Sequence, residues 1–354
     1  MPLCAESPRH VEGCPLWGFR SAAWLALSLA VAVAVGLWRM EGGSVYEGAR
    51  LTWLVSGEGH LPYQHRVLVP YVAGALQKLG LGTALQPVFS PLALDQVATA
   101  LDTPPDLAAI FLLIEIGSLW GMLLAFRALA ARCGSGEAAS RIGALVLAAL
   151  LLLPQFLSPT ERLWYPSDVP AVLVVVLGYL ALFCARPRLF DVVFLLGCLN
   201  RETSLFLLPV LLLLPSQVSG SKRPVIHAAA LALAWAAIKA GIFFAFRGNH
   251  GYPIHPNIFL NIEILSSTRG ALVSVALATV CAAVVVAVIR RGADVKVQAA
   301  LKASVLLLGA TLFAGKLDEF RVYSELAPVA VLVGLAAAQT RSGVLAAAKQ
   351  SPVA

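Results

Sequence analysis

The chain has 354 residues, of which 59% are hydrophobic and 13% charged, with a formal net charge of +7 and a mean hydropathy of +0.82. Soluble domains are about 45–50% apolar and about 25% charged, so this composition excludes an ordinary soluble enzyme, a disordered chain and a secreted disulfide scaffold. It fits helices whose outer faces contact lipid, each of which needs about 20 apolar residues.

The apolar runs predict an all-α fold, a polytopic integral membrane helical bundle. In chain order, the predicted spans cover residues 21–38, 105–128, 142–158, 168–184, 224–246, 270–289, 303–316 and 325–340. The segment 189–215 fits either one helix with a charged pair in its middle or two short helices that turn at residues 200–203. Residues 38–41 are not the small residues of a cleavage site, which favours a retained first span over a cleavable signal.

The distribution of basic residues favours the short-helix hairpin at 189–215. With the hairpin, the chain has about ten spans, both termini are cytoplasmic, and 15 Lys and Arg residues lie inside against 9 outside, leaving out Arg201 and Lys239. With a single helix the counts become 11 inside and 13 outside, against the positive-inside rule. This topology predicts a cytoplasmic tail at 1–20, one transmembrane domain at 21–340 and a second cytoplasmic tail at 341–354.

The same topology gathers polar residues on the external side, where 13 of the 19 acidic residues fall. The external loop 39–104 contains two helical stripes of apolar residues, at 45–55 and 66–78, which predict amphipathic helices at the membrane interface. The segment 86–105 carries four prolines and is predicted to be more irregular.

Four polar clusters lie at the predicted outer ends of spans. They are residues 39–47, residues 63–70, residues 165–170 together with 200–203, and residues 316–325. A carboxylate near the membrane surface can act as general base on an incoming hydroxyl. Arginines beside it can bind a phosphate and stabilise its charge as it leaves. This combination favours transfer from a lipid-linked phosphate donor.

The layout of residues 20–340 resembles the GT-C glycosyltransferases, polytopic enzymes similar to protein O-mannosyltransferases and lipid A aminoarabinose transferases. The resemblance is carried by the acidic residue after the first span, the interfacial helices and the hairpin with its charged turn. The stretches YQHRVLVP, YPSDVPAVLVVVLG, NRETSLFLLP and DEFRVYSELAPV resemble a group of bacterial membrane proteins that is loosely similar to GT-C enzymes. It implies an enzyme that takes sugar from a polyprenyl-phosphate donor on the external face.

By this resemblance, the catalytic carboxylate of the first external loop falls on Glu41 or Glu47, where the family normally has Asp. Arg201 matches the position where such enzymes often place a basic residue near the donor phosphate. We expect Arg66 and Arg321 to bind the same phosphate together with Arg201. Asp168, Glu202 and Glu319 are expected to orient the acceptor or the arginines, with Asp168 also a candidate catalytic carboxylate.

Each of these residues also has a structural interpretation. Asp168 could cap a helix, Arg66 could extend along the interface, and Arg201 could form an ion pair with Glu202 that holds the hairpin. Asp318, Arg321 and Glu325 have the spacing of a helical network, which is a structural alternative for them. Glu115 and Lys239 lie inside predicted spans, where they could pair with each other or line a proton or substrate path.

Two other functions stay open: a transporter or flippase for a lipid-linked or anionic solute, and a non-catalytic subunit of an envelope polysaccharide machine. No cofactor is predicted, and no Asp-x-Asp pair or histidine spacing supports a divalent metal or zinc. The expected partners are a polyprenyl-phosphate-linked sugar and the lipid bilayer, without nucleic acid, in a bacterial inner membrane. The sequence leaves the sugar, the acceptor and the oligomeric state open.

Overall fold

A computed structural model describes residues 22–153, 163–252, 257–266, 294–314 and 320–350, and all of its regular structure in these ranges is helical, without a strand. The first part holds α1 (Ala22–Glu41), η1 (Glu47–Ala49), α2 (Leu51–Ser56), η2 (Tyr63–His65), α3 (Leu68–Lys78), α4 (Leu81–Phe89), η3 (Ser90–Leu92) and α5 (Leu94–Ala100). The middle part holds α6 (Pro105–Arg132), α7 (Glu137–Leu150), α9 (Asp168–Phe183), α10 (Pro187–Asn200), η4 (Glu202–Phe206), α11 (Leu207–Leu213) and α12 (Ser216–Ser219). The last part holds α13 (Pro224–Phe246), α14 (Ile258–Ser266), α16 (Val295–Ala314), η5 (Phe320–Leu326) and α17 (Ala327–Gln350).

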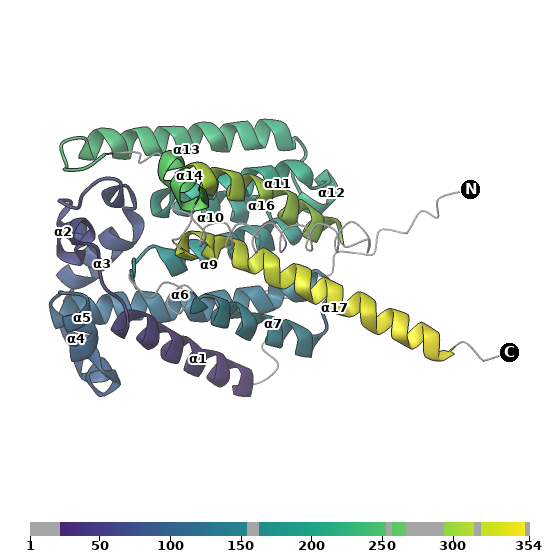
Figure 1. Ribbon diagram of the computed structural model, residues 1–354, viewed down its shortest axis with the longest axis horizontal. Helices are drawn as coiled ribbons and strands as arrows, with labels where there is room; N and C mark the ends of the chain where they lie inside the picture. The colour runs from purple at the N-terminus through teal and green to yellow at the C-terminus, as the bar shows by residue number, and fades with distance from the viewer. Residues whose placement is uncertain (1–21, 154–162, 253–256, 267–293, 315–319, 351–354) are drawn as a thin grey trace.

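The long helices run side by side along the long axis of the molecule, and the short elements α2 to α5 gather at one end (Figure 1). In the described residues, α1, α6 and α13 are each long and apolar enough to cross a membrane. The all-helical prediction is therefore confirmed for the described part of the chain, and the composition of these helices is consistent with a membrane protein.

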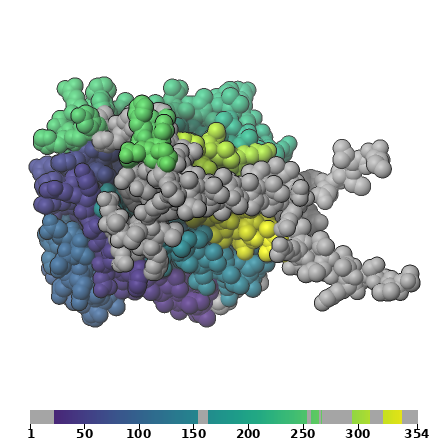
Figure 2. Space-filling view, in the orientation of Figure 1, coloured from purple at the N-terminus to yellow at the C-terminus, as the bar shows by residue number. Residues whose placement is uncertain are grey.

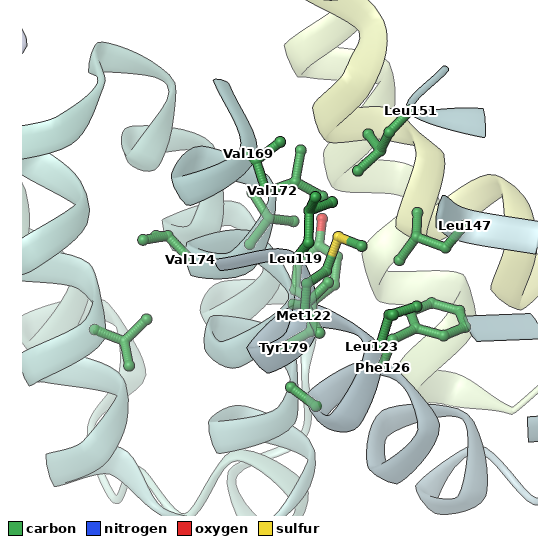
Figure 3. Close-up of a cluster of buried hydrophobic side chains, with 14 of the residues drawn as sticks. Leu119, Met122, Leu123, Phe126, Leu147, Leu151, Val169, Val172, Val174 and Tyr179 are labelled. Atoms are coloured by element: carbon green, nitrogen blue, oxygen red, sulfur yellow. The ribbon is translucent and has the colours of Figure 1, made fainter. Parts of the chain in front are cut away.

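The centre of the bundle is α6, which packs against α1, α7 and α9. Its contact with α7 and α9 is made by Leu119, Met122, Leu123 and Phe126 (Figure 3). These side chains are fully or almost fully buried, whereas α13 has only 11% of its most apolar stretch buried. Figure 2 shows α13 along one edge of the molecule, which leaves most of its apolar surface exposed. Exposing such an apolar surface costs little free energy when the surrounding medium is lipid.

Several helices coincide with the predicted spans, and others differ in their bounds. Residues 224–246 are helical as predicted and α9 ends one residue earlier than its predicted span, but α16 begins at Val295 instead of 303. The helix α17 continues through Gln350, into the segment predicted as a tail. The predicted span 270–289 and residues 154–158 of another lie outside the described residues.

Two expectations for the loop 39–104 were wrong. The segment 45–55 is not one helix, because Arg50 (φ −52°, ψ 133°) adopts a non-helical, polyproline-II-like conformation between η1 and α2. The segment 86–105 is largely helical, because its prolines lie at positions where a missing N–H is tolerated: Pro91 and Pro105 stand in the first turns of η3 and α6. Pro87 is the exception, inside the short α4. The second stripe, 66–78, is helical from Leu68 as α3.

The break predicted at residues 200–203 is present. The helix α10 ends at Asn200, Arg201 is extended, and η4 and α11 follow. The chain reverses here: Arg201 lies beside Asp168 at the start of α9, and Gly220 lies against the backbone of Ala185 just beyond the end of α9. The segments before and after the break therefore run antiparallel along the same neighbour.

Candidate functional site

The break after α10 brings together three buried charged side chains. The guanidinium Nη1 of Arg201 lies 3.3 Å from Asp168 Oδ1 and 3.1 Å from Glu325 Oε1. Only 3% of Asp168, 5% of Arg201 and 2% of Glu325 is exposed. One cation between two carboxylates carries a formal charge of −1, and we call this trio the acidic half of the site.

Local backbone structure presents Arg201 to its partners. An extended residue cannot continue the helix, so the chain turns, and the side-chain amide of Asn200 donates a hydrogen bond to the carbonyl of Ser167, 3.1 Å away. Ser204 Oγ in turn donates to the carbonyl of Arg201 at 3.1 Å. Asp168 is in the first turn of α9, where a negative charge is stabilised by the helix dipole. The turn is thus held to the start of α9 by both side-chain and backbone groups.

A second group of charges adjoins the first. Lys239 Nζ, on α13, donates a hydrogen bond to Glu202 Oε1 at 3.3 Å, and Glu202 follows Arg201 directly. Arg66, between η2 and α3, acts electrostatically on both Glu202 and Glu325. Two cations with one carboxylate carry a formal charge of +1, and we call Arg66, Glu202 and Lys239 the basic half.

Aromatic packing joins the segment that carries Arg66 to the segment before α9. The rings of Tyr63 and Tyr165 stack with their centroids 5.2 Å apart, and the guanidinium carbon of Arg66 lies 6.0 Å from the Tyr63 ring. Aromatic pairs of this kind add about 0.5–1.5 kcal/mol beyond the burial of their area. This stack fixes the two halves relative to each other.

His65 lies against the basic half. Its ring meets that of Phe243 edge-on at 6.3 Å, and only 9% of the residue is exposed. Burial is the largest influence on its imidazole and lowers its pKa from the ordinary 6.5, while Glu202 acts in the opposite direction. Near neutral pH the ring is therefore held in its neutral form.

A separate buried ion pair joins α1 to α6. Arg39 Nε donates to Glu115 Oε1 at 2.7 Å, and Arg39 Nη1 donates to the carbonyl of Leu151 at 2.8 Å. The interpretation of Glu115 and Lys239 as partners is wrong, because Glu115 pairs with Arg39 and Lys239 pairs with Glu202. Periodicity places a residue on a helix face but does not identify the helix that faces it.

The predicted site residues fall into three groups. Asp168, Arg201, Glu202 and Arg66 come together as described above. Glu41 is exposed at the end of α1, and the side chain of Glu47 is 77% exposed, 3.9 Å from Arg50. Glu319 lies outside the described residues; Arg321 is in η5, but its side chain is not among the described features.

The structure also bears on the structural interpretations of three residues. Asp168 is not an N-cap, because it is the first residue inside α9 and Ser167 holds the cap position. Arg201 pairs with Asp168 and Glu325 rather than with Glu202. Glu325, interpreted as part of a local helical network, reaches across to Arg201; its other predicted partners, Asp318 and the side chain of Arg321, lie outside what the structure describes.

Sequence reasoning missed Glu325 and His65 as members of this cluster, and it did not assign Lys239 to it. Lys239 gave a signal, since an isolated charge inside an apolar run needs a partner. His65 and Glu325 gave weaker ones, because both stand next to charged candidates without a spacing that links them to residues 200–203. In the described residues, no group of three His, Cys, Asp or Glu side chains could hold a metal ion.

The arrangement places a negatively charged group and a positively charged group side by side at one helix break. A buried carboxylate can accept a proton from a hydroxyl, and an adjoining cationic group can stabilise a phosphate that leaves. Comparison of the chain with protein-family models, curated proteins and solved structures gave no match.

Proposed function

We propose that this protein is a GT-C-like membrane glycosyltransferase that moves a sugar from a polyprenyl-phosphate donor to an acceptor of the bacterial cell envelope. The observation that supports the proposal most directly is the pairing of Arg201 with Asp168 and Glu325 beside the oppositely charged basic half. Glycosyl transfer needs a carboxylate base on one side of the anomeric carbon. It also needs cationic groups on the other side, where the phosphate leaves.

In this proposal an acceptor hydroxyl gives its proton to a carboxylate while its oxygen forms a bond to the anomeric carbon. The bond between that carbon and the phosphate oxygen breaks, and its electron pair leaves with the polyprenyl phosphate. We assign the base to Asp168, with Glu41 and Glu47 as alternatives from the resemblance. Arg66 and Arg321 would bind the phosphate, while Arg201, held by two carboxylates, would orient Asp168 as well as the donor.

The proposal includes the finer topology. The chain would cross the bacterial inner membrane about ten times, with both termini in the cytoplasm and the hairpin 189–215 entering from the cytoplasmic side. A break between two short helices at membrane depth is tolerated where its backbone is buried in protein or faces a water-filled cavity. The charged residues at 200–203 would then lie on the external side, where lipid-linked sugars are used.

The test is donor turnover by the purified protein in lipid nanodiscs, measured as release of polyprenyl phosphate from a panel of polyprenyl-phosphate-linked sugars. Arg201→Ala should lower turnover about 100-fold, the size of effect seen when one charge-stabilising donor is removed. Arg201→Lys keeps the charge and should recover part of the activity. Arg141→Ala is the matched control, because Arg141 pairs with the half-exposed Glu137 and such pairs contribute little.

Loss of fold is separated from loss of function by measuring the thermal stability of each variant in the same nanodiscs. If folded Arg201→Ala binds and turns over donor as the unmodified protein does, the assignment of the site is wrong. If the unmodified protein uses no donor of the panel, the proposal of glycosyl transfer from these lipids is wrong as well.

The transporter is a second candidate, favoured by the buried Arg39–Glu115 pair between two membrane-length helices. Charges buried in such helices often line solute or proton paths. Movement of a lipid-linked or anionic solute by proteoliposomes, without any transfer of sugar, would decide in favour of transport.

A further inference from the structure

His65 is the least explained polar group of the site. In the part of the chain that the structure describes, its Nε2 is buried and has no hydrogen-bond partner. A buried polar atom without a partner costs about 1–3 kcal/mol, so native structures rarely keep one unless a ligand or water completes it. The groups around this nitrogen indicate which kind of ligand could accept its hydrogen bond.

Two cations and one carboxylate act on His65. Lys239 and Phe243 are one turn apart on the same face of α13, and the His65 ring packs against Phe243. The charged groups that act on the ring are Glu202 from η4, Lys239 from α13 and Arg66 in its own segment. The element η1 also packs against η2 and carries Glu47, whose side chain is 77% exposed.

We propose that His65 and Lys239 bind the phosphodiester of the donor together with Arg66, and that the ring takes up a proton when the phosphodiester binds. The inference rests on the proposed glycosyltransferase function and adds two residues and a proton to its phosphate site. Nε2–H of His65 donates a hydrogen bond to one phosphate oxygen. Lys239, which donates to Glu202 in the structure, also donates a hydrogen bond to the phosphate.

Proton uptake follows from the charges. In the free protein, burial keeps the pKa of His65 below 6.5, so the ring is neutral at pH 7. A phosphate anion in contact with Nε2 favours the imidazolium and raises that pKa. Between the two pKa values the complex holds one proton more than the free protein, so affinity for the donor rises as pH falls through this window.

The experiment measures binding by calorimetry in nanodiscs at several pH values from 5 to 8. The lipid probe is a polyprenyl-phosphate-linked glucose, and the soluble probe is dimethyl phosphate. Both are phosphodiesters, which lack the second ionisation near pH 6 of a phosphate monoester, so any proton taken up belongs to the protein. Binding of both probes assigns the site to a phosphodiester from either source, whereas binding of the lipid probe alone assigns it to the lipid donor.

We expect the unmodified protein to bind the lipid probe up to about tenfold more tightly per pH unit as the pH falls through the window, the limit for one proton. His65→Gln keeps an N–H donor that does not titrate, and it should bind at pH 8 within about threefold of the unmodified protein with no pH dependence. His65→Phe and Lys239→Met should each weaken binding by about tenfold or more, because a hydrogen bond to a charged group is lost.

His60→Gln is the matched control, since His60 belongs to the same segment but stacks on Trp53 with ring centroids 5.7 Å apart. It should keep both the affinity and the pH dependence. An equal pH dependence in His65→Gln and the unmodified protein overturns the role of His65 and leaves the proposed function standing. No binding of the lipid probe by the unmodified protein overturns this phosphodiester site, and the proposed function is overturned as well if no other lipid of the polyprenyl-phosphate-linked panel is bound or turned over.

Discussion

Arg39 and Glu115 show how single residues hold this bundle together. The guanidinium of Arg39 bonds to a carboxylate of α6 and to the carbonyl that follows α7, so one side chain connects three helices. Arg39 is 6% exposed and Glu115 1% exposed. Removing one member of such a pair leaves a buried charge without compensation, whereas removing both removes the cost of burying either.

We therefore expect Arg39→Met or Glu115→Leu alone to lower the free energy of unfolding by about 3–5 kcal/mol. The double variant should lie closer to the unmodified protein than either single variant does. Unfolding by denaturing detergent, in a double-mutant cycle, measures the coupling between the two residues. Additive losses would show that the pair is not coupled.

At the scale of elements, the turn after α10 depends on a close approach between helices. A Cβ on Gly197 would lie 2.5 Å from Ser204 Oγ and 2.7 Å from Val174 Cγ1. Ser204 is the residue that donates a hydrogen bond to the carbonyl of Arg201. Glycine at this position therefore lets α10, η4 and α9 pack closely enough to place Arg201 beside Asp168.

Gly197→Ala should destabilise the protein by about 1–3 kcal/mol through overpacking, and it should lower donor turnover because Ser204 and Arg201 are displaced. Gly241→Ala in α13 is the control, since a Cβ there meets nothing within 4 Å and alanine favours the helix. Thermal melting and turnover in nanodiscs would be measured for both variants. A Gly197→Ala protein as stable and active as the control would contradict this account of the turn.

The sequence was sufficient to predict α13 and the break at Arg201, because a long apolar run and a charged interruption are local signals. It also grouped Asp168 correctly with residues 200–203. The partners of Glu115, Lys239 and Glu325 were not predictable in the same way, because each ion pair joins elements far apart in the chain. Periodicity constrains faces, while the neighbours of those faces depend on the packing of the whole bundle.

At the scale of the whole molecule, the reversal at Arg201 determines which ends of helices share a side. The start of α10 and the segment after α12 both lie near the end of α9, as the contact of Gly220 with Ala185 requires. Arg188 and Lys222 are exposed at this end. A single continuous helix over 189–215 would separate these two residues by the thickness of a membrane.

We expect Arg188→Cys and Lys222→Cys, each in a background without other cysteines, to react with a membrane-impermeant maleimide only after intact cells are permeabilised. Glu58→Cys, at an exposed position between α2 and η2, should react in intact cells. Labelling of Lys222→Cys from outside while Arg188→Cys stays protected would rule out a membrane-inserted hairpin.

The side-chain amide of Asn249 donates hydrogen bonds to the carbonyls of Gly57 and Gly59, at 2.9 and 2.8 Å. The backbone N–H of Leu61 donates to the carbonyl of His250 at 2.7 Å. The loop that leads into His65 and Arg66 is therefore bound to the chain just beyond α13, the least buried of the three described helices that are long and apolar enough to cross a membrane. A helix tilts when its length does not match the bilayer, and a tilt of α13 would pull on these hydrogen bonds. With α13 placed across a bilayer, we expect the thickness of that bilayer to affect the geometry of the basic half.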